Sequence, residues 1–448
     1  MARNLLNSWK TSEDALVRVF RNSAWLFSSK GVSAILSLFY LAIVTRSLGV
    51  AGFGTFILIV SAGQIVAAFF RVQTWQAIVQ FGTPLLAGPD RSGFRRIARR
   101  GFLVEAGGGI LACILMGFLL PPLAEQFGLG QDIQSGLLTY TLILLFAYRS
   151  TPTGILRAQD RFRDGAIGDV AIPVVRMAGA AGLVLTTPTM AGFLVVWGVS
   201  ELICALILWL LVWRNGSNAV AQPPAELLDQ QPAEMPSRSL FFRFLLATNL
   251  SHLLNVIRER FVVIIVGLFV GAVAAGLFRL ADQLANSINR LTEIFARPIF
   301  AELSRLYGQR NFDELSRLFF RSLRISAIAG ISMFVVLVLL GEPLIQLMSG
   351  PDYLPAYPLL LLLAAATIIN LVGVGLEPLI QASDRAGTAF LLRLFSLLVL
   401  LGLLVVLLPG YAASGAAIAM LLSSALGAAM LLWISWSLLK EIRTGQSG

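Results

Sequence analysis

Residues 273–300 read VAAGLFRLADQLANSINRLTEIFARPIF, a stretch as long as a membrane-spanning helix that carries polar side chains at regular intervals. Steps of 3, 4, 4, 3 and 4 residues separate these positions and confine them to a helical stripe about 80° wide. The stripe consists of Arg279, Asp282, Asn286, Arg290, Glu293 and Arg297. Charged side chains cost several kcal/mol when they face lipid, so we expect this stripe to face protein or a water-filled cavity.

The composition of the whole chain predicts a membrane environment. Of its 448 residues, 57% are hydrophobic and only 13% are charged, about half of the roughly 25% charge of a soluble domain. Windows of about 20 mostly apolar residues, enough to cross a bilayer, occur twelve times. They cover residues 25–45, 53–73, 102–122, 136–152, 166–186, 190–213, 244–267, 273–300, 324–344, 357–381, 386–408 and 414–439. These windows, numbered here as spans one to twelve, predict an all-α integral membrane protein.

Lysine and arginine are distributed unevenly among the predicted loops. The loops on the side of the N-terminus hold 24 of them, whereas the opposite loops hold only Arg46. Short cytoplasmic loops retain Lys and Arg, so we predict that both termini are cytoplasmic. Because this topology accounts for most of the net charge of +10, the charge does not indicate a nucleic-acid partner.

The sequence predicts two halves joined by a linker. Residues 214–243 contain AQPPAELLDQQPAEMPS, which is typical of a linker, and they separate a six-helix bundle at 25–213 from another at 244–439. Residues 1–24 lack the apolar core of a removable signal peptide; they form either an amphipathic helix on the cytoplasmic leaflet or a solvated tail. Residues 440–448 form a cytoplasmic tail.

An offset of 222 residues aligns the two halves at positions that apolar composition does not explain. Gly54 falls on Gly276, and Pro121 falls on Pro343. Chance similarity between leucine-rich helices is the alternative explanation. Six spans per half is an even number, so both halves start from the same side of the membrane. This parallel repeat is typical of transporters that rock one bundle against another.

Polar residues of other spans also gather on single helical faces. His252, Asn255 and Glu259 share one face of span seven, and the offset places Lys30 of span one against His252. In span six, Glu201 stands alone.

The ionisable residues predicted to lie within the spans comprise nine cations and seven carboxylates. This surplus favours an anionic ligand, because the guanidinium fork matches phosphate oxygens. The alternative is that Arg279 with Asp282, and Arg290 with Glu293, are ion pairs within one helix that only specify packing. With two cysteines and one histidine, a thiol-rich metal site is excluded, and no nucleophile motif or glycine-rich nucleotide loop indicates an enzyme.

Several stretches together resemble a known family. LAIVTRSLGVAGFGTF in the first half, and ARPIFAELSRLYGQRNFDEL and GPDYLPAYPLLLLLAAATIINLVGVGLEPLIQASDRAG in the second, are similar to bacterial polysaccharide flippases. These belong to the multidrug/oligosaccharidyl-lipid/polysaccharide (MOP) superfamily. The resemblance implies two six-helix bundles around a central cationic cavity in the bacterial inner membrane. It also implies export of an undecaprenyl-diphosphate-linked oligosaccharide, for O-antigen or exopolysaccharide, by alternating access.

With the cationic cavity that the resemblance implies, our hypothesis gives the polar residues the following roles. The cations expected to bind the diphosphate and its sugar are Lys30, Arg71, Arg279, Arg290 and Arg297. The carboxylates expected to exchange a coupling H⁺ or Na⁺ are Glu259, Glu293, Glu377 and Asp282. The supporting polar residues are Gln64, His252, Asn255 and Asn286. Expected partners are the lipid-linked glycan, the bilayer and the polysaccharide polymerase or export machinery; apart from the coupling ion, we expect no cofactor and no metal.

Two other functions remain open. A membrane glycan polymerase or ligase would be an enzyme, and we would expect it to have a long exported loop with Arg or His, whereas the exported loops predicted here are short. A drug or cation antiporter of the same superfamily is the nearer alternative. Such transporters tend to rely on membrane carboxylates, whereas the first bundle here offers Lys30 and Arg71.

Overall fold

In a computed structural model, the chain is helical apart from short connections within the residues that the structure describes. The described residues are 2–86, 92–126, 130–214, 235–287, 312–372 and 386–444. Each of the twelve predicted spans coincides at least in part with a helix. Among the described residues, six stretches are long and apolar enough to cross a membrane: Lys30–Leu86, Ser92–Phe118, Phe162–Leu185, Met190–Arg214, Glu314–Ser349 and Leu391–Ser437. Two of them are long enough to contain two spans each.

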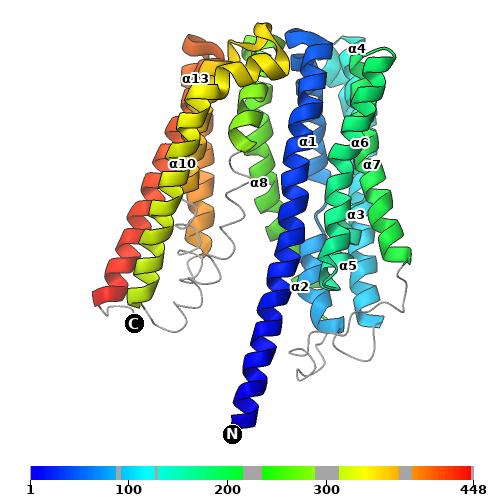
Figure 1. The fold of residues 1–448 in the computed structure, drawn as a ribbon. Coiled ribbons are helices and arrows are strands. Elements are labelled where there is room, and N and C mark those ends of the chain that lie inside the picture. The colour runs from blue at the N-terminus through cyan, green and yellow to red at the C-terminus, as the bar shows by residue number, and fades with distance from the viewer. Residues whose placement is uncertain are drawn as a thin grey trace. The chain divides into compact units, whose positions relative to one another are not determined.

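The first helix, α1 (Ala2–Phe70), contains spans one and two, separated at Gly49 (Figure 1). Gly49 has a φ of 66°, a conformation that glycine adopts far more readily than residues with a Cβ. The offset of 222 residues places Gly271 against Gly49, and Gly271 has a φ of 109°. It follows directly after α8 (Arg238–Val270) and precedes helical residues 272–287. The same two-span hairpin therefore occurs once in each half, as the repeat predicts.

The two hairpins contact each other through equivalent glycines. A Cβ at Gly54 would collide with the carbonyl group of Ala272, and a Cβ at Gly276 would lie 3.1 Å from the Cα of Gly54. Gly54 and Gly276 are paired by the offset. Their close approach requires the absence of side chains, which explains why glycine occurs at both positions.

Six further helices follow α1 in the first half of the chain. They are α2 (Trp75–Leu86), α3 (Ser92–Gln126), α4 (Gln131–Leu145), α5 (Ser150–Ala158), α6 (Phe162–Leu185) and α7 (Met190–Arg214). With 12 and 9 residues, α2 and α5 are too short to cross a bilayer on their own. These two short helices pack against each other, and α7 packs against both α4 and α6.

The remaining described elements belong to the second half. They are α10 (Phe312–Ser349), the 3₁₀ helix η2 (Pro351–Tyr353), α11 (Ala356–Val372) and α13 (Ala386–Thr444). Spans eleven and twelve both lie in α13, and they are separated at Ala412, which has a φ of 50°. Arg46, the one cation predicted on the exported side, donates to the carbonyl oxygens of Met348 and Leu347 at 2.9 and 2.5 Å. It therefore caps the C-terminal end of α10.

Contacts group the chain into two compact units. Unit 1 comprises Met1–Val44 and Ile59–Arg260, and unit 2 comprises Thr45–Leu58 and Phe261–Gly448. The tip of the first hairpin is thus part of unit 2, and the N-terminal part of α8 is part of unit 1. Residues 215–234 of the predicted linker lie outside the described residues.

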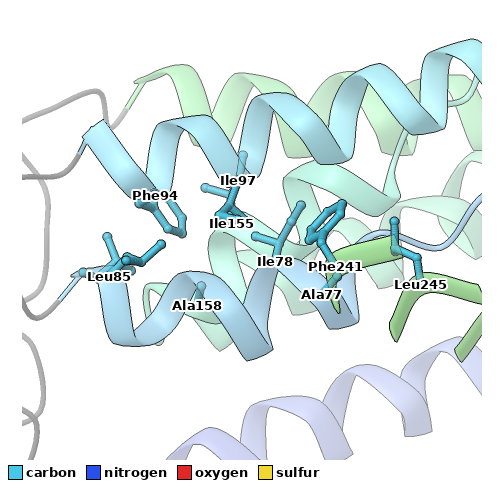
Figure 2. Packing of buried hydrophobic residues seen from close by; sticks show 10 residues of the cluster. Ala77, Ile78, Leu85, Phe94, Ile97, Ile155, Ala158, Phe241 and Leu245 are labelled. Atoms are coloured by element: carbon cyan, nitrogen blue, oxygen red, sulfur yellow. The ribbon is translucent and has the colours of Figure 1, made fainter. Parts of the chain in front are cut away.

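A tightly packed apolar cluster joins α2, α3, α5 and the start of α8 in unit 1 (Figure 2). Ile78 of α2, Ile97 of α3 and Phe241 of α8 are all 0% exposed. The rings of Phe81 and Phe244 meet edge to face with centroids 5.2 Å apart. Close packing of this kind stabilises helix contacts within a membrane, so the start of α8 is firmly attached to unit 1.

Candidate functional site

Short breaks follow span two and interrupt span four, so the prediction of one continuous helix from 136 to 152 is wrong, whereas span two ends three residues before its predicted boundary at 73. The helix of span two ends at Phe70 and resumes as α2 at Trp75; the helix of span four ends at Leu145 and resumes as α5 at Ser150. We call residues 71–74 the first break and residues 146–149 the second break. Interrupted helices in transporters present helix ends and unpaired backbone groups to polar ligands.

A buried carboxylate fixes the second break. Glu105 of α3 is 0% exposed, and it accepts hydrogen bonds from the backbone N–H groups of Ser150 and Thr151, both at 2.9 Å. The Thr151 hydroxyl donates to the same carboxylate at 2.7 Å. These N–H groups begin α5 and therefore have no partner within the helix. The Ser150 hydroxyl accepts from the backbone N–H of Trp75 at 3.0 Å and from the Thr74 hydroxyl at 3.4 Å, so the two breaks are bound to each other.

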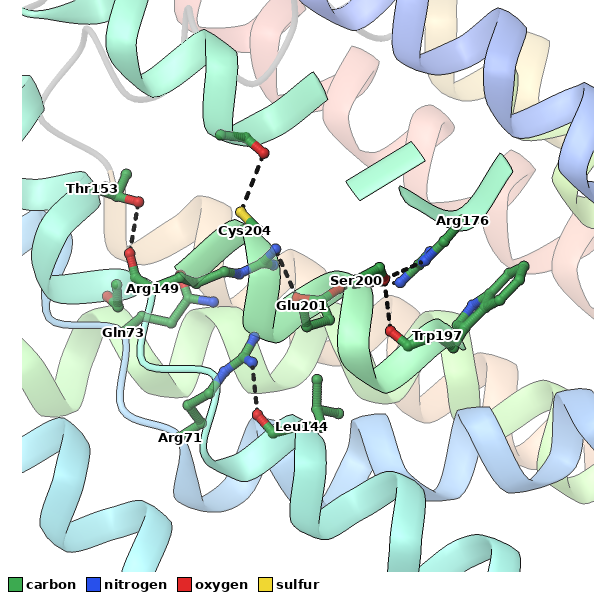
Figure 3. Close-up of polar contacts among 12 residues, drawn as sticks. Arg71, Gln73, Leu144, Arg149, Thr153, Arg176, Trp197, Ser200, Glu201 and Cys204 are labelled. Carbon is green, nitrogen blue, oxygen red and sulfur yellow. Dashed lines mark hydrogen bonds and ion pairs between the residues drawn. The ribbon is translucent and has the colours of Figure 1, made fainter. Parts of the chain in front are cut away.

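Four charged residues converge at these breaks (Figure 3). Arg149 of the second break lies 2.9 Å from Oε2 of Glu201 on α7, and Arg176 of α6 lies 3.2 Å from Oε1 of the same carboxylate. Arg71 of the first break donates to the carbonyl oxygen of Leu144 at 3.3 Å. We call Arg71, Arg149, Arg176 and Glu201 the arginine cluster.

The arginine cluster has a surplus of positive charge. Three guanidinium groups share the carboxylate of Glu201. The further carboxylates that act on them are Glu105, which acts on Arg71, and Asp169, which acts on Arg149. Within the described residues, the Arg71 guanidinium contacts a carbonyl oxygen and no carboxylate. The side chain of Arg149 remains 35% exposed, compared with 11% for Arg176. Arg71 and Arg149 are therefore the members best placed to bind an anion.

Aromatic rings cover the third arginine. The guanidinium of Arg176 lies 4.6 Å from the ring centroid of Trp197 and 5.9 Å from that of Tyr40, and these two rings meet edge to face at 4.9 Å. Arg176 also donates to the Ser200 hydroxyl at 3.0 Å. Cation–π contacts and the ion pair hold this guanidinium in the interior of unit 1.

The residues predicted for the site in unit 1 are only partly brought together. Arg71 belongs to the arginine cluster, and Nε2 of His252 lies 2.9 Å from Nε2 of Gln73 in the first break. Lys30 and Gln64 are half-buried on α1. On α8, the exposed residues of the predicted set are Asn255 and Glu259.

The described part of span eight forms a local network. Arg279 is ion-paired with Oδ2 of Asp282 at 2.5 Å, and Asn286 donates to Oδ1 of the same carboxylate at 2.6 Å. The alternative prediction of an ion pair within this helix is therefore confirmed for Arg279 with Asp282. Four predicted site residues lie outside the described residues: Arg290, Glu293, Arg297 and Glu377.

Three members of the arginine cluster are missing from the site predicted by sequence. The prediction that Glu201 stands alone is wrong, because arginines of two other segments reach its carboxylate. Arg149, which falls near the end of the predicted span at 136–152, lies at a break between two helices. One signal for this break is present in the sequence: Ser150 and Thr151 followed by Pro152 are typical of a helix start.

Comparisons with known proteins identify the family. A family model described as polysaccharide biosynthesis protein matches residues 19–304. The chain is also 31% identical over 350 residues to the inner membrane protein YghQ of Escherichia coli (strain K12), which covers 78% of this chain and 97% of that protein. The chain belongs to the polysaccharide biosynthesis protein family. The resemblance seen in its sequence is thereby confirmed, and its apolar, membrane-spanning helices agree with a relative that is named as an inner membrane protein.

Solved structures show the fold of this polysaccharide biosynthesis family protein. An inward-facing multidrug resistance MATE family transporter of the MOP superfamily matches with a TM-score of 0.66 at 15% identity, covering 91% of this chain and 96% of that one. A MOP superfamily transporter from Pyrococcus furiosus, described as having a binding pocket of reverse polarity that suggests a different function, matches with a TM-score of 0.59 at 16% identity, covering 94% and 96%. The family member described here thus has a MATE-like fold over more than nine tenths of its length.

Proposed function

We propose that the protein is a flippase that moves an undecaprenyl-diphosphate-linked oligosaccharide from the cytoplasmic to the periplasmic leaflet of the bacterial inner membrane. The family supports a role in polysaccharide biosynthesis, and the MATE-like fold supports transport by alternating access. The proposal includes twelve spans in two parallel six-helix bundles, with both termini cytoplasmic. The glycan is a precursor of O-antigen or exopolysaccharide.

The arginine cluster is the observation that carries the choice of substrate. A diphosphate presents several anionic oxygens, and the guanidinium fork can bind two of them at once. Arg71 and Arg149 belong to two adjacent breaks. Arg71 contacts a carbonyl oxygen and no carboxylate within the described residues, and Arg149 pairs with Glu201 while its side chain stays 35% exposed. In the proposed complex these two residues bind the diphosphate, while the prenyl chain stays in lipid.

The cations and carboxylates predicted in the second half have separate roles in the proposal. Arg279 and Asp282 bind each other, so we assign them to helix packing. Arg290 and Arg297, together with Lys30, remain proposed contacts of the polar glycan, and a chamber between the two bundles remains part of the proposal. Glu259, Glu293 and Glu377 remain sequence-based candidates for ion exchange.

A drug or cation antiporter is the second candidate, because the solved MATE transporters share the fold. The positive surplus at the arginine cluster disfavours it, since a cationic drug would meet like charges. In the Pyrococcus furiosus relative, too, pocket polarity is described as suggesting a different function. Deletion of an antiporter should change sensitivity to cationic dyes and leave surface glycan intact.

Leaflet exchange of a fluorescent undecaprenyl-diphosphate glycan in proteoliposomes tests the proposal. We expect Arg71→Ala to lower the exchange rate at least tenfold, because a hydrogen bond to a charged group contributes roughly 1.5–3 kcal/mol. Arg149→Lys keeps a charge beside Glu201 but loses the fork, and it should lower the rate by a smaller factor. The matched control is Arg214→Ala, at the exposed end of α7.

Two outcomes of this assay would count against the proposal. Equal exchange by the wild type, Arg71→Ala and Arg214→Ala, at equal protein levels, would overturn the anion site. Transport of a cationic dye in place of the glycan would favour the antiporter.

A further inference from the structure

The first break is attached to α8 through Gln73. The backbone N–H of Gln73 donates to Oδ1 of Asn249 at 2.6 Å, and Nε2 of Gln73 lies 2.9 Å from Nε2 of His252. Asn249 and His252 are three residues apart, so they lie on the same face of α8. His252 is the only histidine of the chain.

The orientation of the Gln73 amide is fixed by a neighbour. The indole N–H of Trp75 donates to Oε1 of Gln73 at 3.1 Å, and an indole has no acceptor to offer in return. The amide oxygen therefore faces Trp75, and the amide NH₂ group faces His252. It follows that Nε2 of His252 must accept this hydrogen bond, which requires a neutral imidazole with its proton on Nδ1.

Protonation of His252 removes the acceptor. In the imidazolium both ring nitrogens are donors, so an N–H group of His252 would point at the NH₂ group of Gln73. A rotated amide would accept from His252 but would turn its NH₂ group towards the Trp75 N–H. No orientation of Gln73 satisfies both neighbours, and the contact between Gln73 and protonated His252 must open.

The charges around His252 link this contact to the arginine cluster. The charged groups that act on its ring are Arg71 of the first break, Arg149 of the second break and Glu259 of α8 itself. The two arginines oppose a further positive charge, whereas Glu259 favours it. An anion bound to Arg71 and Arg149 would cancel the opposing charges and so promote protonation of His252. By linkage, protonation would promote binding of the anion equally.

Apolar contacts hold α8 next to this titratable contact. Phe241 and Leu245 belong to the cluster of Figure 2 and are 0% and 3% exposed. Such contacts do not titrate, and neither does the hydrogen bond from the Gln73 backbone to Asn249, so a proton would loosen α8 at His252 and leave the part from its N-terminal end to Asn249 attached. Residues 238–260 of α8 belong to unit 1, whereas its remaining residues belong to unit 2. A change at His252 therefore acts on a helix that both units share.

We propose that His252 is a proton-binding site of the transport cycle, and that proton uptake opens the Gln73–His252 contact and frees α8 at His252 from the Gln73 side chain, while Asn249 stays bound to the Gln73 backbone. The proposal rests on the proposed function for its link to an anionic substrate. The opening of the contact itself needs no substrate.

A distance measurement on the full-length protein in nanodiscs tests the opening. Spin labels at Leu250 of α8, which is 45% exposed, and at exposed Gln80 of α2 report the separation within unit 1, after replacement of both native cysteines by alanine. We expect one distance at about pH 8 and a second, longer one as the pH falls through the range in which imidazole titrates and below it, to about pH 4.5. The second population should rise about fivefold between these values.

Two variants separate the proposed contact from a general effect of acid. His252→Gln offers a neutral acceptor that does not titrate, and it should abolish the change with pH. Gln73→Glu offers acceptors to both Trp75 and protonated His252, and it should reverse the dependence, with the shorter distance favoured at low pH. A wild-type distance that does not change with pH, or a His252→Gln protein that changes as the wild type does, would overturn the proposal.

Inorganic pyrophosphate distinguishes this proposal from the proposed function. Its addition should move the midpoint of the distance change to higher pH in the wild type and not in Arg71→Ala. An opening that depends on His252 but is insensitive to pyrophosphate would contradict the anion site and leave the proton site standing. A loss of glycan exchange in Arg71→Ala, together with a distance that does not respond to pH, would contradict the proton site and leave the anion site standing.

Discussion

Equivalent helix pairs of the two halves are joined by different chemistry. In unit 1, α6 and α7 are linked by the ion pair between Arg176 and Glu201. In unit 2, the repeat aligns Glu201 with Ser423 of α13 at the offset of 222 residues, or with Ala425 once the two-residue slip that aligns residues 158–161 with 382–385 is included. Ser423 donates to the backbone oxygen of Ser396 at 2.9 Å, and the two hydroxyl oxygens lie 3.2 Å apart.

This difference shows that packing of these helices does not require charge. The repeat aligns Arg176 with a leucine, Leu398 or Leu400 at offsets of 222 or 224, and Arg149 with Leu371. The two arginines that pair with Glu201 are therefore replaced by apolar residues in the second half. A buried ion pair is often no more stabilising than a well-packed apolar pair. The charges of unit 1 therefore exceed what the fold needs, and this excess is the reason for assigning them a ligand.

The largest effect is expected when Glu201 is replaced by serine, the residue that the offset of 222 residues aligns with it in unit 2. Glu201→Ser leaves the largely buried Arg176 and the partly exposed Arg149 without their carboxylate and should lower the free energy of unfolding by about 3–5 kcal/mol. Adding Arg176→Leu removes one of these unpaired charges and should recover at least about 1 kcal/mol. Denaturant titration in detergent measures both variants. If the loss of stability in the double variant equals the sum of the losses in Glu201→Ser and Arg176→Leu, the two residues are not coupled.

A smaller effect is expected at the second break. The offset places Ala327 against Glu105, so this carboxylate is specific to unit 1. Glu105→Gln turns an NH₂ group towards the donors of Ser150 and Thr151 and should cost about 1–3 kcal/mol. Glu342→Gln, exposed on α10, is the matched control and should stay within about 0.5 kcal/mol. Equal melting temperatures for the two variants would refute the capping role of Glu105.

The smallest effect is expected in unit 2. Ser423→Ala removes a neutral hydroxyl pair and should cost only about 1 kcal/mol, because hydrogen bonds between neutral groups contribute about that much. The same denaturant titration measures it. A loss as large as that of Glu201→Ser would contradict the distinction between the two halves.

Much of the fold could be predicted from local properties of the sequence. The positions of the helices follow from runs of apolar residues, and the hairpins follow from glycines at 49 and 271, both in the left-handed region. The local ion pair of Arg279 with Asp282 follows from a spacing of three residues, which places both on one helical face. The family could be recognised because its motifs occur in order along the chain.

The site depended on contacts between helices, which no single helical period encodes. Arg149 and Arg176 reach Glu201 from two other segments, and Glu105 of α3 binds the start of α5. The two breaks were hidden for the same reason, since their backbone groups are satisfied by distant side chains rather than by local turns. The sequence by itself determined which segments enter the membrane, because transfer of a helix into lipid depends on its own composition and length. Only the tertiary structure decided which charges meet, because that depends on the faces that neighbouring helices turn towards each other.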